Sequence, residues 1–237
     1  MKGVLFKPEM IKAIAEGCKT VTRRTDGLKE INIYPDERLE YKGLLPNDYY
    51  LKKSHHSSFK KHPEHYHWFL GKQLGEINPI PVKPRYHAGE TVYVKETWRV
   101  GAWNQDNRAV AIDYKLDNFA RKEWLQVPDN FDFEKLWIQS TDDAEVADSK
   151  YDESGAYYWE PGESPCRWRS PLFMPEWASR HFLMIDSVRP ERFILANMTP
   201  DEIKLEGGEQ AVILLKEYGG LWLWRIEFHP VKQEVKP

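Results

Sequence analysis

The sequence predicts an α+β fold, because five or six short apolar or alternating segments are accompanied by short helical patterns near both ends of the chain. Hydrophobic residues make up 41% of the 237 residues and charged residues 30%, a composition that supports a folded core. The formal net charge is −3. A protein that coats nucleic acid without sequence preference is usually basic, so the composition favours a local basic patch or a small ligand.

The cysteine content and the hydropathy pattern indicate a cytoplasmic protein. Only Cys18 and Cys166 occur, and no CxxC motif or disulfide framework is present. The N-terminus lacks the apolar run of a signal peptide, and no stretch approaches the ~18 apolar residues of a membrane-spanning helix. We therefore expect no membrane partner.

The N-terminal region predicts a strand, a helix and a second strand. Residues 4–6 are apolar, and residues 7–16 carry one apolar stripe at helical spacing. Pro8 suits the first helical position, and Gly17 is the expected stop. Residues 20–22 are β-branched and are expected to be extended.

The segment after this helix combines one amine, two hydroxyls and two guanidinium groups within six positions. In an extended strand Thr20 and Thr22 share one face. Lys19 then lies at the start of the strand, and Arg23 and Arg24 lie at its end. The alternative interpretation is a solvated basic strand edge, because charge runs are usually found at the surface.

Two long segments differ in character from the rest. Residues 25–83 are rich in turn signals, and we interpret them as an elaborated loop region with hairpin pieces at residues 31–34 and 49–51. Residues 115–165 are acidic and aromatic and predict a second insertion that lies mostly at the surface.

Five of the eight histidines lie in the first of these segments: His55, His56, His62, His65 and His67. On a strand, His65 and His67 would share one face, an arrangement that a metal can use. No cysteine accompanies them, and the neighbouring lysines indicate a polar surface loop. A contact with phosphate is favoured over a metal, because the segment is basic within an acidic chain. We therefore predict no metal and no cofactor.

The stretch 91–98 alternates as a strand does and places Glu96 on the same face as Trp98 and two valines. A carboxylate on an apolar face is costly unless it is paired or used. One interpretation is a buried ion pair with Arg23 or Arg24, and the other is a carboxylate that binds substrate.

The remaining elements complete the α+β pattern. Strands are predicted at residues 109–114, 183–188, 191–194 and 221–228. Thr199 and Glu202 form a capping box for a short helix that Gly207 is expected to end. A second short helix is predicted at residues 209–217.

Five blocks of the sequence resemble, in the same order, the ASCH domain of the PUA-like superfamily, although the intervals between the blocks differ. The blocks are Gly17-x-Lys19-Thr20-x-Thr22-x-Arg24, residues 89–98 (GETVYVKETW), residues 168–180, residues 198–207 and residues 222–228. The block at 168–180 is similar to the phage and prophage branch of this family. The resemblance implies a small mixed β-barrel with flanking short helices, built as one domain over residues 1–237 with insertions at 25–83 and 115–165.

The resemblance also implies an activity, namely hydrolysis of the amide in N4-acylated cytidines by a lysine, a threonine and a glutamate. By position in the motifs, these residues are Lys19, Thr22 and Glu206. A threonine hydroxyl needs a base, and a lysine serves as one when its pKa lies well below ~10.4. Arg23 and Arg24 would lower that pKa by repulsion. Glu206 would hold the cytosine amino group or relay a proton.

Further residues are candidates for substrate binding. Trp98 and Trp177 offer aromatic faces for a base and Arg180 offers a guanidinium for a phosphate, although all three are equally suited to the core. With Arg23, Arg24 and Glu96 they complete the candidate binding set. The expected ligand is a modified nucleoside or nucleotide. The alternative is a non-catalytic PUA-like module that binds RNA or a modified base, and a third interpretation is an accessory protein with a vestigial pocket.

Overall fold

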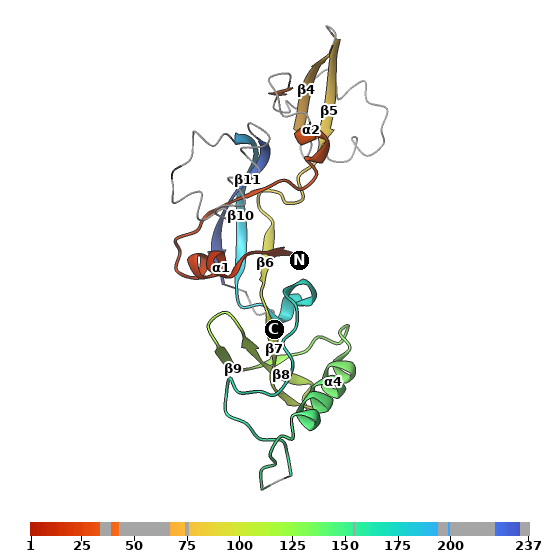
Figure 1. The fold of residues 1–237 in the computed structure, drawn as a ribbon, viewed down its shortest axis with the longest axis vertical. Coiled ribbons are helices and arrows are strands. Elements are labelled where there is room, and N and C mark those ends of the chain that lie inside the picture. Colours follow the sequence, from red (N-terminus) through yellow and green to blue (C-terminus); the bar gives the residue numbers. More distant parts are fainter. Residues whose placement is uncertain are drawn as a thin grey trace. The chain divides into compact units, whose positions relative to one another are not determined.

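The computed structural model describes residues 1–33, 39–42, 67–73, 76–153, 155–193, 199 and 221–232, which form a mixed α and β fold (Figure 1). Contacts divide the chain into two compact units. Unit 1 consists of Met1–Ile11, Val92–Phe182 and Lys232–Pro237, and unit 2 consists of Lys12–Thr91 and Leu183–Val231. Segment 115–165 thus falls in unit 1 and segment 25–83 in unit 2. The description as one domain with two insertions stays a prediction.

Two groups of strands build unit 1. Strand β1 (Lys2–Leu5) pairs in parallel with β6 (Thr91–Lys95), and the buried Val4 lies opposite the buried Val94. An antiparallel sheet has the strand order β7-β8-β9, with bounds Trp98–Asn104, Ala109–Tyr114 and Phe119–Gln126. The predicted strand at residues 109–114 is confirmed by β8.

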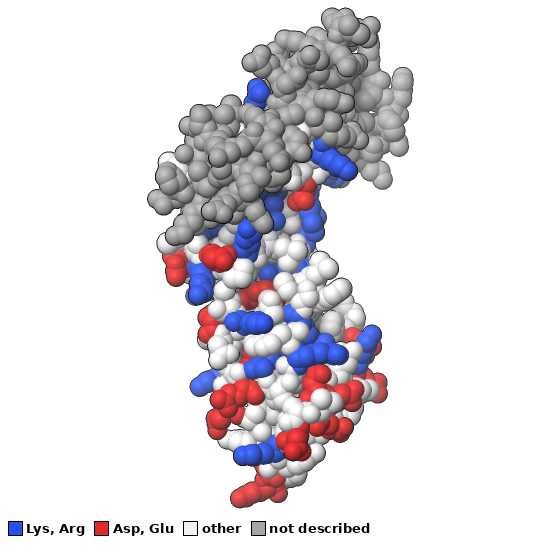
Figure 2. Space-filling model, viewed as in Figure 1, with Lys and Arg blue, Asp and Glu red and all other residues white. Residues whose placement is uncertain are grey.

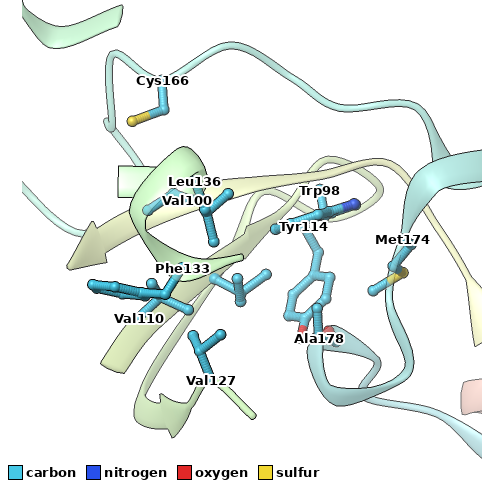
Figure 3. Close-up of a cluster of buried hydrophobic side chains, with 11 residues drawn as sticks. Trp98, Val100, Val110, Tyr114, Val127, Phe133, Leu136, Cys166, Met174 and Ala178 are labelled. Carbon is cyan, nitrogen blue, oxygen red and sulfur yellow. Dashed lines mark hydrogen bonds between the residues drawn. The ribbon is translucent and has the colours of Figure 1, made fainter. Parts of the chain in front are cut away.

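Helix α4 (Phe133–Val146) covers this sheet with an apolar face (Figure 3). Its N-cap is Asp132, whose side chain accepts from the backbone N–H of Lys135 at 3.0 Å. The buried positions recur at helical spacing: Phe133, Leu136, Ser140 and Ala144. Phe133 and Leu136 belong to one hydrophobic cluster with residues of β7 and β8, namely Trp98, Val100, Val110, Ile112 and Tyr114. Most residues of the segment 115–165 are exposed or half-buried, as the sequence predicted, but the sequence did not predict the buried face of α4, whose acidic residues mask its apolar stripe.

Strand β7 contains a bulge at Gly101, where the register with β8 shifts between Val100 and Ala102. A Cβ atom at this position would lie 2.6 Å from Oδ1 of Asp113. The glycine therefore lets the Asp113 carboxylate approach the strand, where it pairs with Nε of Arg99 at 3.0 Å.

The N-terminal helix is confirmed as α1 (Pro8–Ala15). The chain reverses at Gly17, whose φ of 73° is the left-handed conformation that favours glycine. The backbone N–H groups of Cys18 and Lys19 both donate to the carbonyl of Ala13, at 2.8 and 2.9 Å. This turn holds Lys19 against the end of the helix.

Three strands of unit 2 follow the order β10-β11-β2, with bounds Phe182–Phe193, Leu221–Val231 and Val21–Arg24. The strands predicted at 183–188 and 191–194 form one continuous strand through Pro190, and the predicted strand at 221–228 is confirmed by β11.

A second antiparallel sheet of unit 2 has the order β3-β4-β5, with bounds Leu39–Lys42, His67–Gln73 and Glu76–Val82. Residues 29–33 form helix α2, so the hairpin piece expected at residues 31–34 is wrong. Asn32 explains the position of this helix, because its side-chain amide donates to the carbonyl of Trp222 at 3.0 Å and accepts from the Trp222 N–H at 2.8 Å.

None of the sheets formed by the described strands closes into a barrel, so the structure shows the α+β class and not the PUA-like barrel. The hairpin piece at 49–51 and the helices predicted at 199–206 and 209–217 lie outside the described residues. Within the described part of the chain, no helix is long and apolar enough to cross a membrane.

The buried face of α4 is expected to contribute strongly to stability. Leu136 is 5% exposed and Ile138 on the same helix is 45% exposed. Leu136→Ala should lower the free energy of unfolding by ~2–5 kcal/mol, because it leaves a cavity against β7 and β8. Ile138→Ala should cost under ~1 kcal/mol. Urea unfolding followed by circular dichroism measures both, and equal losses would contradict the packing described for α4.

Candidate functional site

In unit 2, the segment from Lys19 to Arg24 is only partly solvated. The side chain of Lys19 is 2% exposed and that of Thr22 is 4% exposed. Thr20 is exposed and comes directly before strand β2, which begins at Val21. Its carbonyl accepts the backbone N–H of Phe228 at 2.9 Å, which continues the pairing with β11, and the shared face of Thr20 and Thr22 stays a prediction. A solvated basic strand edge does not describe an amine and a hydroxyl that are both withdrawn from water.

The register of β2 on β11 separates the other residues of this segment. Thr22 lies opposite Ile226, and Arg23 lies opposite Arg225. Residues opposite each other in a sheet share a face, and neighbours along a strand alternate. Thr22 therefore shares its face with the buried Ile226 and, two residues on, with Arg24, whereas Arg23 points to the other face.

On that other face Arg23 belongs to an ion network. Its Nε lies 3.0 Å from Oε2 of Glu191, and its guanidinium lies 5.2 Å from the centre of the Phe193 ring. Arg225 reaches the second oxygen of Glu191 at 3.8 Å and pairs with Glu227 at 3.0 Å. A hydrogen bond from Ser187 and the neighbouring Arg225 and Arg189 hold the pKa of Glu227 below its usual value. Carboxylates thus engage Arg23 and Arg225 in this network.

The buried face of β2 and β11 continues into a cluster of aromatic and polar side chains. Trp224 donates from Nε1 to the carbonyl of Asp26 at 2.9 Å, and its ring packs edge-on against His67 at 5.0 Å between centroids. Burial, with His87 nearby, lowers the pKa of His67 to about 4, so this imidazole is neutral at pH 7. Burial raises the pKa of Tyr86, although Arg85 and Arg24 act in the opposite direction. A neutral imidazole and a neutral phenol can each donate and accept hydrogen bonds.

In unit 1, Glu96 and Arg180 form a bidentate ion pair. Arg180 donates from Nε and Nη2 to the two oxygens of Glu96, at 2.9 and 2.8 Å. It also donates from Nη1 and Nη2 to Asp117, at 2.9 and 3.2 Å. All three nitrogens of the guanidinium therefore contact carboxylates. This leaves Arg180 poorly suited to the phosphate contact that the sequence suggested.

The surroundings of this pair are mostly apolar. The guanidinium of Arg180 lies 4.3 Å from the centre of the Tyr114 ring and 5.3 Å from that of Phe119. Burial raises the pKa of the Glu96 carboxyl, and the hydrogen bonds and charge of Arg180 oppose that rise. For Asp117 burial also acts to raise the pKa, but Arg180 and the N–H of Phe119 outweigh it and bring the pKa below its usual value.

The expected partner of Glu96 is therefore wrong: the ion pair exists, but with Arg180 in place of Arg23 or Arg24. Glu96 lies in the break between β6 and β7, so the single strand expected over residues 91–98 is wrong. The predicted burial of Glu96 is confirmed, and a buried carboxylate requires a cation. The sequence does not tell which of several arginines approaches, since Arg180 is 84 positions away.

The structure also places the two candidate tryptophans. Trp98 is almost fully buried in the core described above, and Trp177 packs against that core. Their rings meet edge-on with centroids 6.1 Å apart. This arrangement favours the core interpretation for both side chains.

Several predicted site residues fall outside the described part of the chain. Glu206 is among them, so the convergence of Lys19, Thr22 and Glu206 on one site stays a prediction. The same holds for all of the histidine cluster except His67, which lies in β4. No group of three or more His, Cys, Asp or Glu side chains among the described residues is placed to hold a metal ion.

Sequence reasoning missed Asp117, Glu191 and Tyr86, each of which contacts or influences a candidate residue. Asp117 and Glu191 are two of 37 acidic residues, and nothing in their local sequence marks them as partners of arginines. Tyr86 lies just before the predicted strand at 91–98, where an aromatic residue in a turn gives no functional signal.

Comparisons of this chain with protein-family models, with curated proteins and with solved structures find no match.

Substitution of Arg180 should reveal how strongly the unpaired, buried carboxylate of Glu96 destabilises the fold. Arg180→Met should lower the free energy of unfolding by ~3–5 kcal/mol at neutral pH, because it leaves a buried carboxylate without its cation. Since burial raises the pKa of Glu96, the folded chain holds that proton more tightly than the unfolded chain. The loss should therefore grow as the pH rises from about 5 to about 8.

Arg189→Met is the matched control, because the pair of Arg189 with Glu227 is partly exposed and 3.5 Å long. It should cost about 0–1 kcal/mol with little pH dependence over this range. Denaturant unfolding at both pH values tests the pair of variants. A loss for Arg180→Met that does not change with pH would show that Glu96 is not the group left unpaired.

Proposed function

We propose that this chain is an ASCH-type protein that acts on a modified nucleoside or nucleotide by hydrolysing the amide of an N4-acylated cytidine. The observation that carries the proposal is the burial of Lys19 and Thr22, an amine and a hydroxyl three positions apart in one unit, while Thr20 between them is exposed. Lysine is among the residues least often buried, and a buried titratable group is a candidate for function.

These residue types suit amide hydrolysis. The hydroxyl of Thr22 would attack the acyl carbon and give its proton to Lys19, which can accept it only as a neutral amine. The bond from the acyl carbon to N4 would then break, and N4 would leave as an amino group after taking up the proton that Lys19 had accepted. Water would release the acyl group from Thr22. Glu206 is the proposed contact for the cytosine amino group.

Of the two arginines beside this segment, Arg24 is better placed to favour the neutral form of Lys19. It lies on the face of β2 that carries Thr22, whereas Arg23 points to the other face and pairs with Glu191. A cation close to an amine disfavours the ammonium form. We therefore assign mainly to Arg24 the role of favouring the neutral amine of Lys19 by repulsion.

The meeting of the sequence blocks supports the assignment to an ASCH-type, PUA-like fold. The block at 17–24 pairs with the block at 222–228 as strands β2 and β11. The block at 89–98 meets the block at 168–180 through Glu96 and Arg180. Blocks that contact one another within each unit are expected if they belong to one architecture.

The charge distribution supports a small substrate rather than a long RNA. The net charge is −3, and Figure 2 shows acidic side chains among the basic ones on the described surface of one face. Binding of a long nucleic acid relies on many contacts to phosphates.

Lys19→Arg is expected to remove most hydrolysis of N4-acetylcytidine, because a guanidinium stays protonated and cannot accept the proton of Thr22. Thr22→Ala should do the same, and the double variant should be hardly slower than either single variant, since residues that act as a unit do not add. The rate of the wild type should rise with pH as the amine becomes neutral. Chromatography of the released cytidine measures each rate.

Thr20→Ala is the matched control, because it removes an exposed hydroxyl two positions from Thr22. It should keep the wild-type rate. Full activity of Lys19→Arg would rule out Lys19 as the base. If the wild type hydrolyses no acylated cytidine but shifts RNA in a gel, the chain is a binding module.

A further inference from the structure

Unit 1 contains an arginine, Arg169, for which one edge of the guanidinium has no acceptor among the residues that the structure describes. Arg169 donates from Nη1 to Oε1 of Gln139 on helix α4, at 3.0 Å. Its Nε and Nη2 atoms are buried and make no hydrogen bond with the described part of the chain. An unsatisfied buried donor is destabilising, and more so in a charged group, so two on one guanidinium require an explanation.

Nε and Nη2 are the two guanidinium atoms that together can bind an oxyanion. Nε and Nη2 lie on one edge of the planar guanidinium and donate two parallel hydrogen bonds. The same unit shows how this edge is used, because Arg180 holds the carboxylate of Glu96 with its own Nε and Nη2 at 2.9 and 2.8 Å. In Arg169 the equivalent edge is buried and has no carboxylate.

The local charge is also unbalanced. Arg167 lies two positions away and its side chain is 60% exposed. Asp143, the acid whose charge acts on Arg169, makes two contacts with Arg167. The Asp143 carboxylate accepts the backbone N–H of Arg167 at 3.1 Å and lies 3.7 Å from its guanidinium. Burial, followed by the repulsion of Arg167, lowers the pKa of Arg169. Two cations thus share one acid.

The neighbouring side chains add further donors. Arg169 and Trp98 face each other across an isolated antiparallel bridge, so their side chains lie on the same side, and the guanidinium is 5.6 Å from the centre of the Trp98 ring. The indole N–H groups of Trp98 and of the adjoining Trp177 are also buried, and neither has an acceptor among the described residues. Among the described residues here, donors exceed acceptors.

We propose that the Nε and Nη2 edge of Arg169 binds one oxyanion, a carboxylate or a phosphate group, held by two parallel hydrogen bonds. Arg167, at the exposed end of the segment, supplies a second positive charge. The site lies in unit 1 and involves none of the residues proposed for amide hydrolysis. It stands on the unsatisfied guanidinium and does not depend on the proposed function.

The test is the thermal unfolding of the full chain with inorganic phosphate or with acetate, against sodium chloride of equal ionic strength. A bound anion stabilises the folded state by mass action, so one anion should raise Tm by about 5–10 °C at roughly 100 times its Kd. A response to phosphate alone assigns the site to phosphoryl groups, and a response to acetate alone assigns it to carboxylates. No response to either anion overturns the proposal.

Two variants at the same position separate the guanidinium edge from its charge. Arg169→Lys keeps the charge without the planar edge and should weaken anion binding at least about ten-fold, measured by isothermal titration calorimetry. Arg169→Met should abolish the response, and without anion its Tm should equal or exceed that of the wild type, because no uncompensated cation remains buried.

Lys135→Met is the control, since it removes an exposed charge from the same unit and should keep the full response. An anion response that persists in both Arg169 variants would overturn the proposal. If Arg169→Met does not fold, Arg169→Lys decides, and a Kd equal to that of the wild type would show that the anion binds elsewhere.

Discussion

The ion pair between Glu96 and Arg180 is the interaction on which the rest of unit 1 depends. Glu96 lies buried between β6 and β7, so a cation must accompany its carboxylate into the interior. Arg180 meets this requirement with two hydrogen bonds and in turn binds Asp117. The rings of Tyr114 and Phe119 lie against the guanidinium. One buried carboxylate thus fixes the segment around Arg180 against the sheet.

The same constraint organises unit 2 in a different way. In unit 2 the side chains of β2 alternate between the two faces of the sheet. Thr22 lies on the buried face, and Arg23 lies on the face of the ion network with Glu191. The segment from Lys19 to Arg24 forms one basic cluster in the sequence, but its side chains lie in two different environments in the structure. This matters for the proposed chemistry, since a base and a nucleophile need a site from which water and competing charges are withheld.

Local patterns predicted the regular elements well where they were strongly periodic. Pro8 and Gly17 marked the ends of α1, and the apolar runs at 109–114 and 221–228 marked β8 and β11. The failures are α2 and α4. Helix α2 is five residues long and contains β-branched isoleucines, and its Asn32 is anchored by Trp222, 190 positions away. Helix α4 carries its apolar stripe among many acidic residues, so its pattern is weak until the sheet beneath it is known.

By itself the sequence determined the α+β class, the positions of the long strands and the burial of Glu96, because these follow from local conformational preference and from period-two alternation. The sequence also indicated Lys19 and Thr22 as candidate catalytic residues. Only the tertiary structure decided that Arg180 pairs with Glu96, that Arg23 faces away from Thr22, and that Arg169 keeps an unused edge. The physical reason is that desolvation and ion pairing depend on which distant segments meet. The identity of a charged residue does not tell which residue it pairs with.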